Sequence, residues 1–448
     1  MSTTSIGTNP TTATIATPHL VVPALRYDLS CGARLVVSPR PHSPVCAIAV
    51  SIDAGHWLDP HGLEGLAAFA GALAVEGTAR YSESRIADLL EPHGGSIVGD
   101  AGSVTASIAG PNWRTLVAVV GEVLTSPTYP TERVERQRAI LLDRLRIDED
   151  EPRVQVARLF NELVYGTDGL GRPRRGTIET IGRITRDDLL AFQSEHVVAG
   201  RAIIGVCGDV EPDLVRAEFE HALAAWPRGH PAPPIPSMFP PLATRLAAWP
   251  AERQQVQLVA GHLGIRRLDP RFAAAVVMDH VLGTGPGFTD RISKRLRDEE
   301  GLAYAVSANL SSSSGRAPGA FQAVIATSKE KVRAALRGFV EEIERIRRER
   351  VSADELHLVR QYLTGSFVLG FEKATRRAAH VVNAERFGLP DGHLDRFLAD
   401  LVTVDEAAIQ ECARTLLHPQ QLVAAAAGPI TKDELAEALE SALAGARA

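Results

Sequence analysis

Two side chains seven residues apart, Arg297 and Tyr304, could together bind and polarise a peptide carbonyl. We expect Arg297 to end a helix, Gly301 to supply a left-handed turn after it, and Tyr304 to open a strand. The arginine offers a planar fork of donors and the tyrosine an O–H donor, and both suit peptide carbonyls and a developing oxyanion. A plainer interpretation stays open, in which Arg297 complements the helix dipole and Tyr304 packs in the sheet.

Candidate metal ligands are few. His56 and His61 lie five residues apart in an expected turn, with no carboxylate placed to orient either ring, so we interpret them as exposed loop histidines. The four cysteines lie far apart without a CxxC pair, which indicates neither a disulfide framework nor a zinc-thiolate site.

The elements that must position these residues belong to a globular chain. Hydrophobic residues make up 45% of the 448 and charged residues 23%, which excludes a disordered, fibrous or coiled-coil protein. Lys and Arg total 48 against 54 Asp and Glu, a net charge of −6 that argues against binding to nucleic acid. The first twenty residues lack a basic residue, and no apolar run approaches the ~20 residues of a membrane span. We expect a soluble cytoplasmic protein without a membrane segment.

A proline-rich stretch divides the chain into two halves of similar length. Residues 227–242 contain seven prolines, which cannot continue a helix or a central strand, so they are predicted to form an extended linker. Residues 1–24 are predicted to form a disordered tail. The remaining chain gives two predicted domains, residues 25–226 and residues 243–448.

The two halves end alike. Residues 202–214 and 422–435 each give a short apolar strand, a Gly turn and an acidic start to an amphipathic helix. Upstream of them, Thr185 and Thr403 are expected helix N-caps followed by acidic residues. These matched pairs predict tandem homologous domains, with the alternative that αβ units simply look alike.

Apolar periodicity predicts the elements within each half. The expected strands are residues 34–38, 47–53, 104–108, 255–261, 304–310 and 319–326. The expected helices are residues 65–72, 84–93, 112–125, 131–149, 271–282, 329–349 and 353–369. Strand pairs alternate with runs of helices rather than in βαβ order. Each domain is therefore expected to be α+β, a largely antiparallel sheet with helices packed on one face.

The segment from Gly55 to Thr78 resembles the zinc-site region of the pitrilysin and mitochondrial-processing-peptidase family. There an acidic-Pro turn and Gly-Leu-Ala lead into a helix bearing His-x-x-Glu-His, in which two histidines on one helix face bind zinc and the Glu is the general base. The matching positions here are Ala68, Phe69, Ala70, Gly71 and Ala72. The family's third ligand, a Glu of a Glu-Glu pair, falls on Asp143 and Arg144. The resemblance therefore implies a first domain whose zinc motif is lost, and no metal in this chain.

Residues 291–307 resemble a second family signature, Leu-Arg-Glu-x-x-Gly-Leu-Ala-Tyr-x-Val. Arg297 and Tyr304 match the Arg and Tyr that reach into the active site from the family's non-catalytic domain. The glycines of the preceding turn, which the resemblance implies as substrate-loop residues, are Gly283, Gly285 and Gly287. With further motifs in the right order, the resemblance extends over nearly the whole chain.

The resemblance implies a clam-like molecule and a role in trans. This chain would be the non-catalytic subunit of a heteromeric zinc endopeptidase, inactive alone, with Zn²⁺ held by a homologous partner that bears His-x-x-Glu-His. It would wall a chamber for unfolded peptides, to which Arg297 and Tyr304 contribute substrate binding and oxyanion stabilisation. Two alternatives stay open: a non-enzymatic scaffold or peptide-binding protein of the same fold, and an active peptidase that uses His56, His61 or Asp143.

Overall fold

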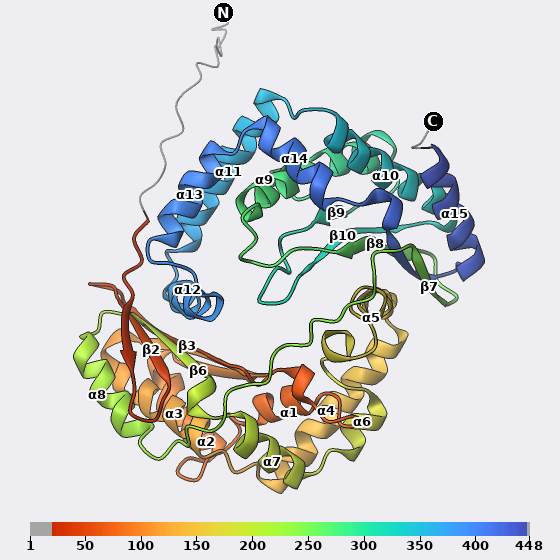
Figure 1. Ribbon diagram of the computed structural model, residues 1–448. Helices are drawn as coiled ribbons and strands as arrows, with labels where there is room; N and C mark the ends of the chain where they lie inside the picture. The colour runs from red at the N-terminus through yellow and green to blue at the C-terminus, as the bar shows by residue number, and fades with distance from the viewer. Residues whose placement is uncertain (1–19, 446–448) are drawn as a thin grey trace, which may run out of the picture.

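The computed structural model describes residues 20–445, apart from the side chain of Phe288, and contains two sheets on opposite sides of the molecule (Figure 1). The first sheet has the strand order β1-β2-β6-β3-β5-β4. Its strands are β1 (Leu25–Asp28), β2 (Arg34–Pro39), β3 (Val45–Ile52), β4 (Ser96–Asp100), β5 (Ser103–Ala109) and β6 (Ala202–Gly208). β2 and β6 are parallel, and the other neighbouring strands are antiparallel.

The second sheet repeats this topology with the order β7-β11-β8-β10-β9. Its strands are β7 (Arg245–Pro250), β8 (Val256–Leu263), β9 (Val306–Asn309), β10 (Ala320–Thr327) and β11 (Val423–Gly428). β7 and β11 are parallel, as β2 and β6 are, and the other pairs are antiparallel. The second sheet thus matches β2-β6-β3-β5-β4 strand for strand, and the predicted α+β fold with two homologous domains is confirmed.

Helices cover the outer face of each sheet, and each half has its own hydrophobic core (Figure 1). In β3, Cys46, Ile48 and Val50 point into the first core, because alternate residues of a strand project to the same face. The helices of the first half are α1 (Leu66–Leu73), α2 (Glu83–Leu90), α3 (Trp113–Thr125), α4 (Thr131–Asp150), α6 (Ile178–Arg183), α7 (Arg186–His196) and α8 (Pro212–Ala222). Those of the second half are α9 (Phe272–Leu282), α10 (Val332–Arg348), α11 (Ala353–Gly370), α13 (His393–Thr403), α14 (Glu406–Leu416) and α15 (Lys432–Gly445).

One helix from each half lies on the inner face of the other half's sheet (Figure 1). α12 (Ala374–Phe387) packs on β3 and β6, and α5 (Pro152–Tyr165) packs on β8 and β11. The α12 contact joins Ala374, Ala378 and Val382 to Ala47, Ala49 and Cys207. The α5 contact joins Val156, Phe160 and Val164 to Val259, Val423 and Ala425. Beyond the predicted helices on one face, each sheet therefore bears a helix of the other half on its second face.

Polar contacts also join the two halves. Arg316, in the loop before β10, donates to both carboxylate oxygens of Asp53 after β3, at 2.6 and 2.5 Å. Arg386 on α12 donates to the hydroxyl of Ser51 at 2.9 Å, and its Nη2 lies 3.9 Å from Asp53 Oδ1. The halves are thus connected by apolar and charged contacts at the same sheet face.

Some local expectations need correction. Thr185 caps α7 as expected, but Asp405 rather than Thr403 caps α14, since its side chain accepts the N–H of Ala408. Thr403 is instead the last residue of α13.

The ends of the predicted domains are described only in part. Residues 1–19 of the expected tail lie outside the described residues, and the chain is packed from Leu20 onward, whose N–H donates to Asp395 at 3.0 Å. Residues 226–244, all of them described, contain no helix or strand, and the domain boundaries at 227 and 242 stay predictions. Between residues 20 and 445, no helix is long and apolar enough to cross a bilayer.

Candidate functional site

The helix that the resemblance matches to the zinc motif, α1, is firmly capped. Asp59 accepts hydrogen bonds from the backbone N–H groups of Gly65 and Ala67, both at 2.8 Å. Arg172 donates to the carbonyl oxygen of Asp59 at 2.5 Å and to the Glu64 carboxylate at 2.6 Å. Burial raises the pKa of Asp59 to about 6. The acidic-Pro turn seen in the sequence is therefore a capping device that fixes where α1 begins.

Backbone occupies the space beyond Gly71, the position that the resemblance matches to the Glu of His-x-x-Glu-His. Ala68, Gly71 and Ala72 share one half-buried face of α1 and carry no ligand atom. A Cβ on Gly71 would lie 2.2 Å from the carbonyl oxygen of Asp100, the last residue of β4. A Cβ on Gly99 would likewise lie 2.1 Å from the carbonyl oxygen of Gly71. Because α1 and β4 touch through their backbones, only glycine fits at residue 71.

The other metal-ligand candidates do not supply a site. Asp143 on α4 is exposed and pairs with Arg146 at 2.5 Å, and Arg144 is exposed as well. His61 is exposed, but His56 is only half-exposed, contrary to its interpretation as an exposed residue, and burial lowers its pKa. Within residues 20–445, no three His, Cys, Asp or Glu side chains are grouped as a metal site requires. The residues present therefore do not fit Zn²⁺, and we derive no chemistry through a metal in this chain.

Arg297 and Tyr304 flank a turn that leads to β9. Arg297 lies in a wide helical segment, Ser293–Glu299, and Gly301 has a φ of 59°, the predicted left-handed conformation. Tyr304 lies two residues before β9 rather than opening it, and it is 91% exposed. The interpretation in which Tyr304 packs in the sheet is therefore wrong. Arg297 pairs with Asp298 at 3.3 Å, and its side chain is 30% exposed.

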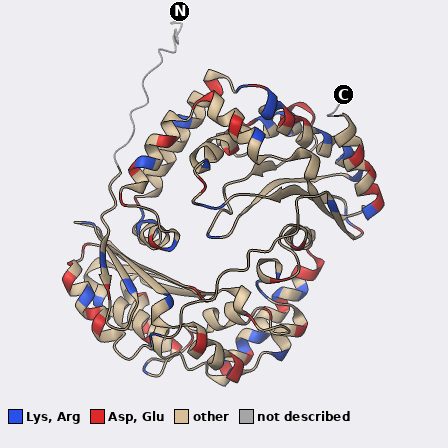
Figure 2. Ribbon diagram, viewed as in Figure 1, with Lys and Arg blue, Asp and Glu red and all other residues tan. Residues whose placement is uncertain are grey.

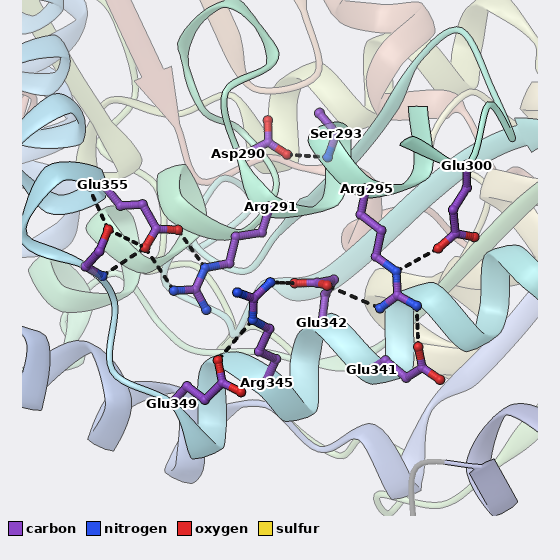
Figure 3. Close-up of polar contacts among 11 residues, drawn as sticks. Asp290, Arg291, Ser293, Arg295, Glu300, Glu341, Glu342, Arg345, Glu349 and Glu355 are labelled. Atoms are coloured by element: carbon purple, nitrogen blue, oxygen red, sulfur yellow. Dashed lines mark hydrogen bonds and ion pairs between the residues drawn. The ribbon is translucent and has the colours of Figure 1, made fainter. Parts of the chain in front are cut away.

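Ion pairs join the segment that contains Arg297 to α10 (Figure 3). Arg295 donates to Glu300 at 2.7 Å, to Glu342 at 3.2 Å and to Glu341. Burial lowers the pKa of Arg295, but the hydrogen bonds to the three carboxylates outweigh it and raise the pKa above its ordinary value. The arginine therefore stays charged and holds three acidic side chains at once.

A second ion pair fixes the beginning of the same segment to α11 (Figure 3). Arg291 donates to the two carboxylate oxygens of Glu355 at 2.8 and 3.0 Å, and Glu355 also accepts the N–H of Ser352 at 2.8 Å. Burial raises the pKa of Glu355, but these bonds lower it to about 2. Asp290 accepts the N–H of Ser293 at 2.8 Å. Residues 290–300 are thus held at both ends by charged contacts.

The three candidate substrate-loop glycines have different roles. A Cβ on Gly283 would lie 2.4 Å from the N atom of Ala308, so this glycine allows α9 to end against β9. A Cβ on Gly285 would lie 2.8 Å from the N atom of Asp290. Gly287 has a φ of 62° and nothing within 4 Å of its Cβ position. Two of the three glycines therefore serve close packing, and only Gly287 lies beside open space.

An edge strand lies beside α1, and another follows Tyr304. β4, which contacts α1, and β9, which follows Tyr304, each pair with one neighbour among the described strands. Figure 2 shows the charged residues mainly on the helices, and β5, β9 and β10 contain none. On β4, Val98 is 64% exposed beside exposed Ser96 and Asp100. An extended peptide can add to such an edge by main-chain hydrogen bonds.

The sequence interpretation missed the residues that position this site. The sequence did contain a pattern that indicates the capping role of Asp59, because an acidic residue shortly before a helix can cap it. No local pattern indicates the contacts of Arg172, since its partners lie more than a hundred residues away in the chain. Arg291 and Arg295 had only a weak signal in the charged pattern of residues 291–300.

Two models of one peptidase family match successive parts of the chain. The model described as insulinase (peptidase family M16) matches residues 34–178, and the model described as peptidase M16 inactive domain matches residues 183–363. A protein of Streptomyces coelicolor described as an uncharacterized zinc protease is 25% identical over 437 residues, which cover 95% of this chain and 94% of that protein.

Solved structures show the same fold. A peptidase M16 inactive domain from Pseudomonas fluorescens has a TM-score of 0.84 and 21% identity, with 91% of this chain and 98% of that chain covered. A protease from Helicobacter pylori has a TM-score of 0.82 and 15% identity, with 91% and 100% covered. At these identities the likeness establishes the arrangement of the two sheets and their helices.

Proposed function

Because the chain belongs to the M16 family of peptidases, we propose that it is the non-catalytic subunit of a heteromeric zinc-dependent endopeptidase. The main support is the contrast between two regions. α1 is capped by Asp59, yet backbone from β4 occupies the space beyond Gly71, where the family has its general base. In the other half, Tyr304 is 91% exposed beside a segment held by ion pairs.

In this proposal the partner, a homologous chain with His-x-x-Glu-His, supplies zinc and the general base. The present chain binds and polarises the peptide. Tyr304 donates its O–H to the carbonyl oxygen on which negative charge develops, and Arg297 donates to a neighbouring carbonyl of the peptide. An edge strand such as β9 binds the extended main chain, so an unfolded peptide fits better than a folded protein.

The partner is tested by co-expression with a neighbouring gene product of similar length that contains His-x-x-Glu-His. We expect a one-to-one complex that cleaves unfolded peptides and holds one zinc ion, while this chain alone neither cleaves nor binds stoichiometric zinc. Tight zinc and proteolysis by this chain alone would contradict the proposal. A stable complex or homodimer that binds peptides without any cleavage would instead favour the scaffold function.

The proposed role of Tyr304 predicts the effect of its removal. We expect Tyr304→Phe to leave folding, partner binding and zinc content unchanged and to lower turnover by the heteromer about 10²-fold, as for loss of one preorganised donor. The apparent substrate affinity should change less, because the bond strengthens as the oxyanion forms. Steady-state kinetics of the purified pair measure both quantities.

Tyr362 on α11 provides a matched control, since it is also exposed, at 42%, and its ring lies against His280. Tyr362→Phe should retain wild-type turnover. If Tyr304→Phe also turns over at the wild-type rate, this chain is a wall of the chamber and donates nothing to the reaction.

A further inference from the structure

We propose that the ion pair between Arg295 and Glu300 is a positioning element, which keeps a widened helical turn open so that Arg297 and Tyr304 are presented together beside β9. The inference rests on the proposed function, because it takes these two residues as the ones that contact the peptide. Neither Arg295 nor Glu300 is assigned to the peptide itself.

The turn between these residues is wider than an α-helix. The backbone N–H of Glu300 bonds to the carbonyl oxygen of Arg295, five residues back, at 2.9 Å. The N–H of Leu302 bonds to the carbonyl oxygen of Leu296, six residues back, at 2.7 Å. An α-helix joins residues four apart, so this segment contains at least one additional residue per turn. Such turns are rare and occur often at functional sites.

The spacing of the ion pair matches the wide turn and excludes the α-helix. At about 100° per residue, side chains five apart on an α-helix point about 140° away from each other and do not meet. Here Arg295 Nε and Glu300 Oε1 are 2.7 Å apart. The pair therefore forms only when the turn is wide, and its free energy favours the wide turn over the regular one.

The same arginine ties the turn to the core of the second half. Arg295 also contacts Glu341 and Glu342 on α10, and the side chain of Glu342 is only 4% exposed (Figure 3). Contacts to a buried helix fix the direction of the turn as well as its width. If the turn closed to an α-helix, the residues after it would rotate by about 100° relative to Arg297, and Tyr304 would be displaced from it.

Hydrogen exchange on the full-length chain alone tests the structural part of the inference. In Arg295→Met, we expect the amides of Glu300 and Leu302 to exchange at least tenfold faster, while the amides of β8 and β10 keep their protection. Arg345→Ala is the matched control, because the ion pairs of Arg345 within the described chain are with Glu342 and Glu349 on α10 and beside it, and not with the turn (Figure 3). Unchanged exchange at Glu300 and Leu302 would overturn the inference.

Removal of Arg295 deprives the buried carboxylate of Glu342 of one of its partners, which could destabilise the whole fold. A second variant therefore separates a local effect on the turn from general unfolding. Arg295→Met with Glu342→Gln removes that charge and should fold with the same local increase in exchange. Glu300→Gln, which weakens the pair and leaves the α10 contacts in place, should give a smaller increase at the same two amides. Equal exchange in all three variants and the wild type would contradict the role of the pair.

A double-mutant cycle in the heteromer tests the functional part. We expect Arg295→Met to lower turnover about tenfold, and to cause no further loss when Arg297→Ala and Tyr304→Phe are already present, because Arg295 acts through those two residues. Additive losses would overturn the positioning role even if exchange increases. If the wild-type pair cleaves nothing, the proposed function fails, and the exchange result decides by itself whether Arg295 holds the turn.

Discussion

Only glycine fits at Gly71, so replacing side chains alone cannot build the His-x-x-Glu-His motif on α1. The positions that match the histidines, Ala68 and Ala72, are half-buried, but a Cβ at Gly71 meets the Asp100 carbonyl oxygen at 2.2 Å. A Glu at this position requires β4 to move away from α1. The backbone contact between α1 and β4 therefore leaves no room for the motif's Glu at this position.

We predict that Gly71→Glu lowers the free energy of unfolding by about 3 kcal/mol or more, through steric overlap with β4. The triple variant with Ala68→His and Ala72→His should bind no stoichiometric zinc. Denaturant unfolding and metal analysis after dialysis measure these outcomes, with the two histidine substitutions without Gly71→Glu as the control. A triple variant with wild-type stability and one bound zinc ion would contradict the prediction, because it would show that β4 moves away from α1 at little cost in stability.

At the same scale, the sequence predicted the identity of the site residues better than their surroundings. The absence of ligand atoms at Ala68 and Ala72 could be seen directly, and so could the left-handed turn at Gly301, because both depend on a single residue type. The exposure of Tyr304 could not, since an aromatic residue near an apolar strand is usually packed. The Arg295–Glu300 contact follows no helical spacing rule, and only the wide turn makes it possible.

At the scale of the element, close contact between α12 and the first sheet depends on Gly205 in β6. A Cβ at this position would lie 2.5 Å from the carbonyl oxygen of Ala378 and 2.6 Å from Val382 Cγ2. Helix and strand therefore approach each other through backbone, as α1 and β4 do.

Gly205→Val is expected to separate α12 from the sheet and to lower the free energy of unfolding by about 3 kcal/mol, as overpacked sites do. Gly182→Val is the matched control, because Gly182 on α6 has nothing within 4 Å of its Cβ position. Thermal and denaturant unfolding followed by circular dichroism compare the two variants. Equal stability of both would mean that α12 adapts to the added side chain.

The helices with local signals were predicted well. Expected residues 65–72 and 131–149 correspond to α1 (Leu66–Leu73) and α4 (Thr131–Asp150), since apolar spacing and end residues are properties of short segments. β4 was missed because its exposed residues alternate without a strong apolar pattern. The place of α12 on β3 was also missed, because that contact joins residues more than 300 apart.

At the scale of the whole molecule, α5 and α12 make the two halves depend on each other. Each half leaves an apolar sheet face to be covered by the other half, and each contributes one helix whose apolar side packs on that face. A half by itself would expose both surfaces to water.

We therefore predict that a chain cut between Pro231 and Ala232 yields two fragments that aggregate when produced separately. Produced together, they should form a one-to-one complex with the helix content of the intact chain, because the contacts of α5 and α12 need no covalent linker. Size-exclusion chromatography with light scattering and circular dichroism distinguish these states. Two soluble, folded, monomeric fragments would show that each half folds independently.

The exchange of helices has a consequence for descent. A duplicated gene ordinarily permits one copy to decay and vanish once its activity is dispensable. Here the half without ligands still provides α5, which covers the inner face of the other half's sheet, and receives α12 in return. Substitutions on α1 therefore leave these contacts in place, whereas deletion of the first half would uncover the apolar inner face of the second sheet. The exchanged helices thus oppose the loss of either half, whatever chemistry that half performs.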